Sequence, residues 1–347
     1  MKPIIRRAFE IVAVVTAIVA VVACSNPTGS DDGGSDDGGG GGAGGSGGQM
    51  GGSVQSGNLN LAGNVTTIAG SAGETGDEDG TGAAARFLYP KSITTDGTYL
   101  YLISQGETDY SQGVTPYYIR KIEIATGEVT TLVDFDEAQV SGLTSDGTML
   151  YLYVWNGVYE VDPETGDSTP ILTISGKTFA GITTDGTYLY LTEEGSGGHG
   201  DVYRVNPSDG SYELFADSDD LGGLAQITTD GSSLFVADMS LDVVHEIDIA
   251  TETVSTLATA NLNVEAIACD GDLLYVAGPT VSPAIGTIDI ETGEFNYLIG
   301  HQTGIGVTDG GIDVAQFAKP TSFTTDGSSL FLTDGDANVS NTIRKTD

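Results

Sequence analysis

The chain of 347 residues carries 49 Asp and Glu against 12 Lys and Arg, so its formal net charge is −37. Proteins bind phosphate backbones by neutralising them with Lys and Arg, and a chain this acidic is therefore not expected to bind nucleic acid. Its two cysteines, Cys24 and Cys269, cannot form a framework of disulfides.

Residues 1–23 predict a secretory signal peptide. Lys2, Arg6 and Arg7 give a positive start, and residues 11–23 are apolar except for one threonine. A helix needs about 20 apolar residues to cross the roughly 30 Å core of a bilayer, so this run is too short to span a membrane. Its length and flanks are typical of the apolar region of a signal peptide.

The end of this run resembles a bacterial lipobox, in which a small residue precedes a cysteine that is lipidated and becomes the mature N-terminus. Here Ala23 precedes Cys24, and Ser25 follows. Several acyl chains anchor stably, because each buried methylene adds about 0.8 kcal/mol. The resemblance implies an extracytoplasmic lipoprotein held at a membrane through Cys24, with Ser25 favouring the outer membrane or cell surface. An ordinary signal peptide followed by a chance cysteine is the alternative.

Residues 24–58 are rich in Gly, Ser and Asp and have almost no apolar side chains. Such a segment cannot offset the entropy of ordering its backbone, so we expect it to be disordered. A Gly-rich coil of about 33 residues has a root-mean-square reach of about 30 Å. We interpret 24–58 as a tether and 59–347 as the folded domain.

The domain repeats one phrase six times. The first copy, 93–102, has an apolar run, an Asp-Gly pair and alternating apolar residues, which together predict a β-hairpin. A third strand, such as 118–124, and a fourth, such as 128–132, follow each hairpin. Four strands per repeat are typical of a propeller blade. The repeated pairs begin at Asp96, Asp146, Asp185, Asp230, Asp270 and Asp326.

The ends of the domain predict a closed ring. The last repeat stops in its third strand, at 342–346, whereas 64–68 is a strand without a repeat of its own. Pairing of these two segments would complete the last blade and leave no long unpaired edge. The sequence therefore predicts an all-β, six-bladed β-propeller of four-stranded antiparallel blades, with the N-terminal strand closing the last blade.

Two longer segments, 70–96 and 300–326, carry an Asp-Gly pair, a Phe and a Pro at the same offsets. Together with the Thr-Thr-Asp-Gly, Leu-Tyr-Leu and Ile-Arg-Lys motifs, they resemble the NHL-repeat family of six-bladed propellers. The middle blades lack the Arg-Phe-Pro part of the pattern, and Ala268-Cys269-Asp270 replaces Thr-Thr-Asp in the fifth blade. The resemblance implies the propeller fold for the whole domain.

Related six-bladed propellers include lyases that need histidines at the mouth of the central channel, and lactonase-like hydrolases with a carboxylate metal site. His199, His245 and His301 lie in a loop and in peripheral strands, so we do not expect them to converge on the axis. The long inter-blade loops gather on the face opposite the Asp-Gly turns, and a ligand is expected there.

Four residues are candidate metal ligands. Glu265 lies near the start of the fifth inner strand, where it is either a channel-mouth ligand or an ordinary strand-start carboxylate. Asp334, Asp336 and Asn338 resemble the opening of a Ca²⁺ loop, without the later Gly and Glu that an EF-hand requires. The six repeated Asp residues are explained by turn formation without a metal. We expect no cofactor, with weakly held Ca²⁺ as the alternative.

These observations favour a non-enzymatic binding module, anchored to the membrane by lipid and binding an extracellular protein or glycan on the loop face. The alternative is a metal-dependent lyase or lactonase-like hydrolase with a carboxylate site at the channel mouth. A mainly structural envelope protein is a third interpretation.

Overall fold

The computed structural model describes residues 59–347, except 60, 62, 109–113, 136–139, 155–156, 175, 194–198, 261, 279–282, 301–303 and 337–338. The expected signal peptide (1–23), the tether (24–58) and the lipidation site Cys24 lie outside the described residues and stay predictions. Within the part that is described, no helix is long and apolar enough to cross a membrane.

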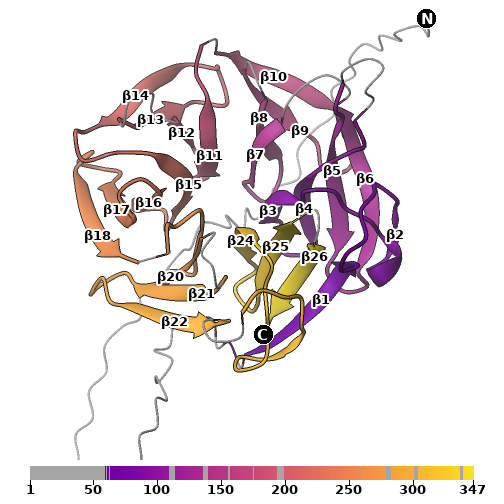
Figure 1. The fold of residues 1–347 in the computed structure, drawn as a ribbon. Coiled ribbons are helices and arrows are strands. Elements are labelled where there is room, and N and C mark those ends of the chain that lie inside the picture. The colour runs from indigo at the N-terminus through magenta and orange to yellow at the C-terminus, as the bar shows by residue number, and fades with distance from the viewer. Residues whose placement is uncertain are drawn as a thin grey trace, which may run out of the picture.

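The described strands form six antiparallel sheets arranged in a ring (Figure 1). In each sheet the first of its four main strands lies nearest the axis, and the following strands lie progressively outward. Two of the sheets carry a short fifth strand at the outer edge. The predicted all-β, six-bladed propeller is confirmed.

The first blade contains β3 (Lys91–Thr95), β4 (Tyr99–Gln105), β5 (Tyr117–Glu123) and β6 (Glu128–Phe135), with β2 (Gly80–Thr81) at its edge and the 3-10 helix η1 (Gly82–Ala84) after it. The second contains β7 (Val140–Ser145), β8 (Leu150–Val154), β9 (Gly157–Val161) and β10 (Ser168–Thr173). The third contains β11 (Phe179–Thr184), β12 (Leu189–Glu193), β13 (Asp201–Val205) and β14 (Tyr212–Asp217).

The fourth blade contains β15 (Leu224–Thr229), β16 (Ser233–Asp238), β17 (Val243–Asp248) and β18 (Val254–Thr259). The fifth contains β19 (Ala266–Cys269), β20 (Leu273–Ala277), β21 (Ile285–Asp289) and β22 (Phe295–Ile299). The sixth contains β24 (Pro320–Thr325), β25 (Leu330–Asp336), β26 (Ser340–Thr346) and β1 (Asn64–Gly70), with β23 (Gly310–Gly311) at its edge.

The ring closes through its two ends, as predicted. Strand β1 pairs antiparallel with β26, so that Val65 lies opposite Thr346 and Gly70 lies opposite Thr342. Because β1 supplies the fourth main strand of the last blade, both ends of the domain are held in one sheet. Closure of this kind removes the long exposed strand edges that favour aggregation.

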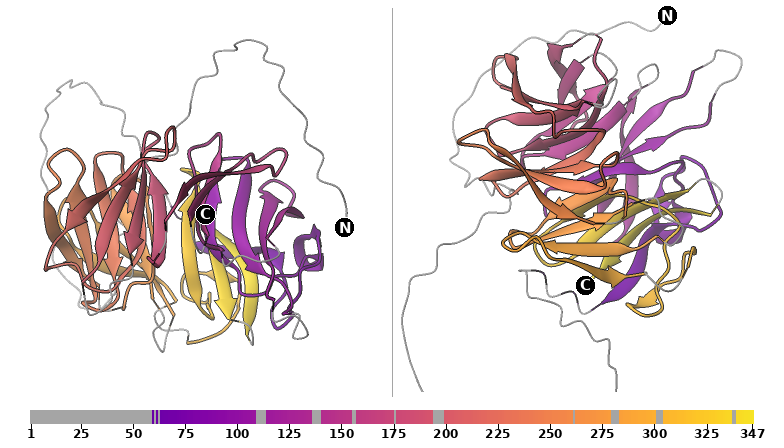
Figure 2. Two further views of the ribbon diagram at one scale, coloured as in Figure 1. Left: turned by 90° about the horizontal axis from the view of Figure 1, so that it is seen from above. Right: turned by 60° about the vertical axis from the view of Figure 1, so that its left-hand side comes forward.

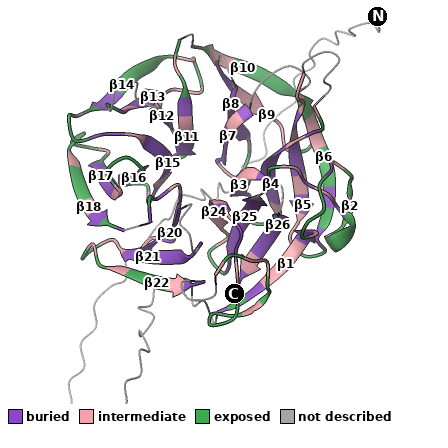
Figure 3. Ribbon diagram, viewed as in Figure 1, coloured by how far each residue is buried: buried purple, intermediate pink, exposed green. Residues whose placement is uncertain are grey.

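The hydrophobic core lies between neighbouring blades. Leu100 and Leu102 of the first blade, for example, pack with Phe331 and Ile343 of the sixth. The inner strands are mostly buried, whereas outermost strands such as β6, β10 and β14 expose much of their length (Figure 3). Full burial of a side chain such as Phe331 contributes about 1.5–3 kcal/mol, so the contacts between blades hold the ring together.

The repeated Asp residues build the turns between first and second strands. In the first blade, Asp96 Oδ1 accepts hydrogen bonds from the backbone N–H groups of Thr98 and Tyr99, at 2.8 and 2.7 Å, and Gly97 adopts φ +87°. Asp96 Oδ2 accepts a third hydrogen bond from the Tyr101 hydroxyl at 2.7 Å. The same acceptor role recurs at Asp146, Asp185, Asp230, Asp270 and Asp326, which confirms the turn interpretation.

The upright sheets seen in Figure 2 place their connections at two opposite ends of the ring. We call the end that carries the six Asp-Gly turns the turn face. We call the opposite end, where each inner strand begins, the loop face. The long inter-blade segments 71–90 and 300–319 reach the inner strands β3 and β24 at the loop face.

Candidate functional site

The central channel opens into a cavity at each face. The turn-face cavity has a volume of about 440 Å³ and is lined by all six inner strands. The loop-face cavity has a volume of about 540 Å³ and is lined by the starts of the inner strands and the segments that lead into them. Both volumes fall within the range of small-molecule pockets, about 300–1,000 Å³.

The turn-face cavity has a lining that repeats around most of the ring and includes Asp270 and Asp326 of the turns. Its lining repeats threonine around the ring, and hydroxyls at this end are already used in the turns; Thr95 Oγ1, for instance, donates to the Tyr99 carbonyl and accepts from Gly97 N–H. Cys269 takes the equivalent place in the fifth blade, where its Sγ accepts from Gly271 N–H at 3.3 Å. The position directly before each repeated Asp carries Thr95, Ser145, Thr184, Thr229, Cys269 and Thr325, and the position before that carries Thr94, Thr144, Thr183, Thr228, Ala268 and Thr324.

The lining of the loop-face cavity differs from blade to blade. One lining position, five residues before each repeated Asp, carries a different side chain in most blades. Two of the six are charged, one basic and one acidic, and the other four are small. In blade order, these residues are Lys91, Ser141, Ala180, Ala225, Glu265 and Thr321.

Lys91 is held at this mouth by an unusual backbone. Tyr89 and Ser92, on either side of it, both have φ +48°, a region that non-glycine residues rarely adopt. The pairing of β3 with β4 shifts register between Lys91 and Ile93. The Lys91 ammonium lies 5.3 Å from the centroid of the Tyr117 ring, and burial lowers the pKa of Lys91. Strained backbone of this kind is concentrated at functional sites in proteins.

Glu265, predicted as a channel-mouth carboxylate, does lie in the lining of the loop-face cavity. Its Oε1 is 3.6 Å from the Lys319 Nζ, and both side chains are partly exposed. The structure therefore pairs Glu265 with a cation. In the described part of the chain, no group of three or more His, Cys, Asp or Glu is placed to hold a metal.

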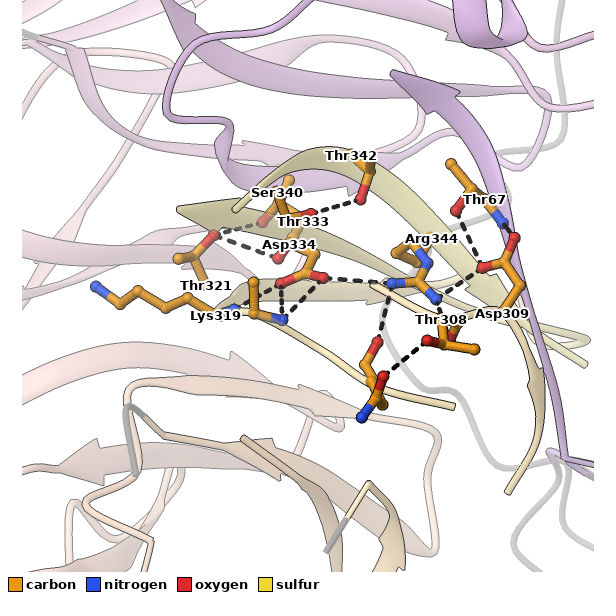
Figure 4. Close-up of polar contacts among 12 residues, drawn as sticks. Thr67, Thr308, Asp309, Lys319, Thr321, Thr333, Asp334, Ser340, Thr342 and Arg344 are labelled. Atoms are coloured by element: carbon orange, nitrogen blue, oxygen red, sulfur yellow. Dashed lines mark hydrogen bonds and ion pairs between the residues drawn. The ribbon is translucent and has the colours of Figure 1, made fainter. Parts of the chain in front are cut away.

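Asp334, predicted as the start of a Ca²⁺ loop, is fully buried, and both its oxygens accept N–H donors (Figure 4). Ala318 N–H donates to Oδ1 and Oδ2 at 3.0 and 3.2 Å, and Lys319 N–H donates to Oδ1 at 2.6 Å. Arg344 Nη1 donates to Oδ2 at 3.3 Å. Burial raises the pKa of Asp334, and the two backbone N–H groups oppose that rise. This geometry supports a structural role.

The equivalent position in other blades performs the same task. Asp334 lies eight residues after the repeated Asp326, and it accepts from the N–H of Ala318, which lies eight residues before Asp326. In the first blade, Ser104 Oγ accepts from Leu88 N–H in the same register. Asp336 ends β25, but its side chain and the whole of Asn338 lie outside the described residues, so their role as metal ligands stays a prediction.

The fourth blade carries a third version of this arrangement, which the sequence did not indicate. Asp238 accepts from Gly222 N–H at 2.6 Å and lies 3.3 Å from His245 Nε2. Burial favours protonation of Asp238, but hydrogen bonds from His245, Gly222 and Leu241 lower its pKa to about 2. His245 is buried inside its blade, His199 is exposed near Asp219, and residue 301 lies outside the described range.

Two buried arginines explain why the segments 70–96 and 300–326 carry an Asp and a Phe at the same offsets. Arg344 Nη2 donates to the Thr308 carbonyl and to Asp309 Oδ1, at 3.1 and 2.7 Å, and the guanidinium lies 5.4 Å from the centroid of the Phe317 ring (Figure 4). Arg120 makes the equivalent contacts in the first blade. Each arginine comes from an Ile-Arg-Lys motif and fixes one inter-blade segment against its blade.

No family model and no curated protein matches the chain. Its fold is similar to that of a protein of unknown function from Bacteroides thetaiotaomicron, with a TM-score of 0.64 and 20% identity over 82% of this chain and 76% of that one. An auxiliary nutrient binding protein from the same organism gives a TM-score of 0.62 and 15% identity, over 82% of this chain and 76% of that one. Regucalcin from Agrobacterium tumefaciens, described as a calcium-binding protein, gives 0.52 and 12%, over 75% of this chain and 90% of that one. At these identities the similarity shows the propeller fold.

Proposed function

We propose that the protein is a lipid-anchored, extracytoplasmic, non-enzymatic binding module that takes its ligand at the loop-face cavity. The observation that carries this proposal is the change in lining between the two faces. The turn-face lining repeats around the ring, whereas the loop-face lining differs from blade to blade and presents Lys91, Glu265 and Lys319. A cavity with a few individual polar groups is typical of a ligand site.

The path of the chain is compatible with a ligand site at the loop face, because the chain enters the ring at the opposite face. Leu59 is buried, and its N–H donates to Asp270 Oδ2, in a turn of the turn face, at 3.4 Å. Gly63 N–H donates to the Asp347 carbonyl at 2.8 Å, beside the end of β26. The segment that precedes the domain therefore joins the ring at the turn face. An anchor at Cys24 would therefore be attached on the side of the ring opposite the loop-face cavity.

Two further observations agree with this proposal. The Arg-Asp-Phe contacts around Arg120 and Arg344 are consistent with membership of the NHL-repeat family. One of the proteins with a similar fold is described as a nutrient binding protein. We infer a ligand from outside the cell, either a glycan or an extracellular protein.

The proposal is tested with the labelled full chain on an array of glycans and extracellular proteins. Specific binding that is lost when the loop-face lining is changed, for example by Ser141→Trp, supports it. The matched variant Thr183→Trp places the same ring at the turn face and should leave binding intact. Binding that survives Ser141→Trp and is lost with Thr183→Trp would contradict the assignment of the site.

A metal-dependent hydrolase or lyase is the second candidate, because Glu265 lies at the channel mouth and one protein of similar fold is described as calcium-binding. Metal analysis of the full chain, compared with Glu265→Gln, decides between the two. One tightly held ion that is lost in Glu265→Gln, together with turnover of a lactone, would favour the enzyme. Equal metal content in the two proteins would favour the binding module.

A further inference from the structure

We propose that the ligand of the loop-face cavity is a sugar acid, whose carboxylate is bound by Lys91. This inference rests on the proposed function and adds the chemical class of the ligand. The pairing of Lys91, the net charge of the cavity, the rest of its lining and the fixed backbone around Lys91 each contribute a separate part of the argument.

The first part is that Lys91, unlike the other Lys and Arg residues of the domain, has no carboxylate partner among the described residues. Eight of the nine Lys and Arg residues in 59–347 have a carboxylate oxygen within 4.0 Å. Among the described residues, Lys91 is the exception, although the chain has about four acids for every base. A partly desolvated ammonium without a counter-ion is unfavourable, and an anionic ligand would supply the missing charge.

The second part is the net charge of the cavity. Its described lining contains Lys91, Lys319 and Glu265 as charged residues, which leaves one net positive charge. That balance fits a single carboxylate. A phosphate dianion would favour more N–H donors or a bidentate arginine, whereas the four described arginines are all paired with carboxylates.

The third part is the rest of the lining, which suits a sugar ring. Tyr89 exposes 46% of its surface beside Lys91, and a tyrosine ring offers an apolar face together with a hydroxyl. Gln105 and Gln226 bring amides to the same cavity, and Glu265 is a hydrogen-bond acceptor for hydroxyl groups. Carboxylate, hydroxyl and C–H surfaces occur together in a uronic acid.

The fourth part is preorganisation. Tyr89 N–H donates to Asn341 Oδ1 at 3.1 Å, and Ser92 Oγ accepts from Leu143 N–H at 2.8 Å. These contacts fix the backbone on both sides of Lys91 to two neighbouring blades. Little backbone freedom is therefore lost when a ligand binds, and a built site of this kind favours affinity.

The test uses the full chain, with galacturonate and glucuronate as probes and galactose and glucose as their neutral counterparts. We expect the uronates to bind at least about tenfold more tightly than the hexoses by calorimetry, because a charge-assisted hydrogen bond to Lys91 is available only to the acids. Lys91→Met should lose that preference. Lys121→Met, which removes a base that pairs with Glu164 on another surface, should keep it.

A separate readout follows Lys91 directly. In the ¹³C-dimethylated full chain, uronates should shift the Lys91 methyl signal, and Lys91→Met identifies that signal. Equal binding of uronates and hexoses, unchanged in Lys91→Met, would overturn the sugar-acid inference and leave a binding module that takes neutral ligands. If no uronate binds or shifts the Lys91 signal, the inference is also overturned, and the array experiment then decides the proposed function by itself.

Discussion

The two faces of the ring differ in how they use polar side chains. At the turn face, six Asp residues in equivalent positions bind backbone N–H groups, and a repeated set of hydroxyls lines the channel. At the loop face, equivalent positions carry Lys91, Glu265 and four small residues. Repetition around a ring indicates a task that every blade shares, namely folding. Departure from repetition indicates a task that the ring performs once.

The largest expected effect concerns the attachment of the protein to the membrane through Cys24. Cys24→Ala removes the predicted lipidation site, so the protein should move completely from the membrane fraction to the soluble fraction. The glycine-rich tether offers a matched control, because Ser46→Ala leaves the cysteine in place and should leave the protein in the membrane fraction. Intact-mass analysis checks the lipid, and an unmodified Cys24 in the membrane fraction would contradict the prediction.

The next effect concerns the buried arginines that fix the inter-blade segments. Arg344→Met leaves Asp334 buried with its charge partner removed, so the free energy of unfolding should fall by about 3–5 kcal/mol. Arg204→Met removes a partly exposed arginine that pairs with Glu213, and it should cost only about 0–1 kcal/mol. Denaturant titration of both variants checks this, and equal losses would contradict the role given to Arg344.

Acid stability reports on the Asp238–His245 contact. The pKa of Asp238 is about 2 in the folded protein and 3.8 in the unfolded chain, so its contribution is present above pH 3.8 and is lost as the pH falls through about 2. A difference of this size corresponds to about 2 kcal/mol. Asp238→Asn should flatten the fall in unfolding free energy between pH 4 and pH 2. An unchanged slope in that variant would show that other carboxylates cause the fall.

The smallest effect concerns the repeated turns. Asp185→Ala removes hydrogen bonds to Thr187 N–H, Tyr188 N–H and the Tyr190 hydroxyl, and it should cost about 1–3 kcal/mol of unfolding free energy. Asp146→Ala removes the same set in the preceding blade and should cost a similar amount. Neither should change ligand binding. A large difference between the two variants, or a loss of binding in either, would assign the turn face more than a folding role.

Sequence reasoning predicted most of this fold because the turns are local. Each Asp-Gly pair binds N–H groups two and three residues further on, so the pattern that forms the turn is visible in a short window. The closing pair of β1 and β26 was also predictable, because one repeat lacked a strand and one strand lacked a repeat.

The functional residues were harder to predict because their contacts are distant in the sequence. Glu265 lines the loop-face cavity because it lies directly before the inner strand β19, and its role as a metal ligand stays a prediction. Lys91 was missed, because what distinguishes it from the other bases is the missing carboxylate partner among the described residues. Comparing the six repeats at the position of Lys91 would have been the available signal. Asp334 resembled a Ca²⁺ ligand because its partners, Ala318 and Arg344, come from other strands and loops.

The most direct test of the contrast between the two faces measures ligand affinity and unfolding free energy together in Lys91→Met and Asp185→Ala. We predict that Lys91→Met loses affinity and keeps its stability, because it removes an ammonium without a carboxylate partner among the described residues. Asp185→Ala should keep its affinity and lose stability. If Lys91→Met lost stability and kept affinity, Lys91 would be a structural residue, and the contrast drawn between the two faces would fail at its position.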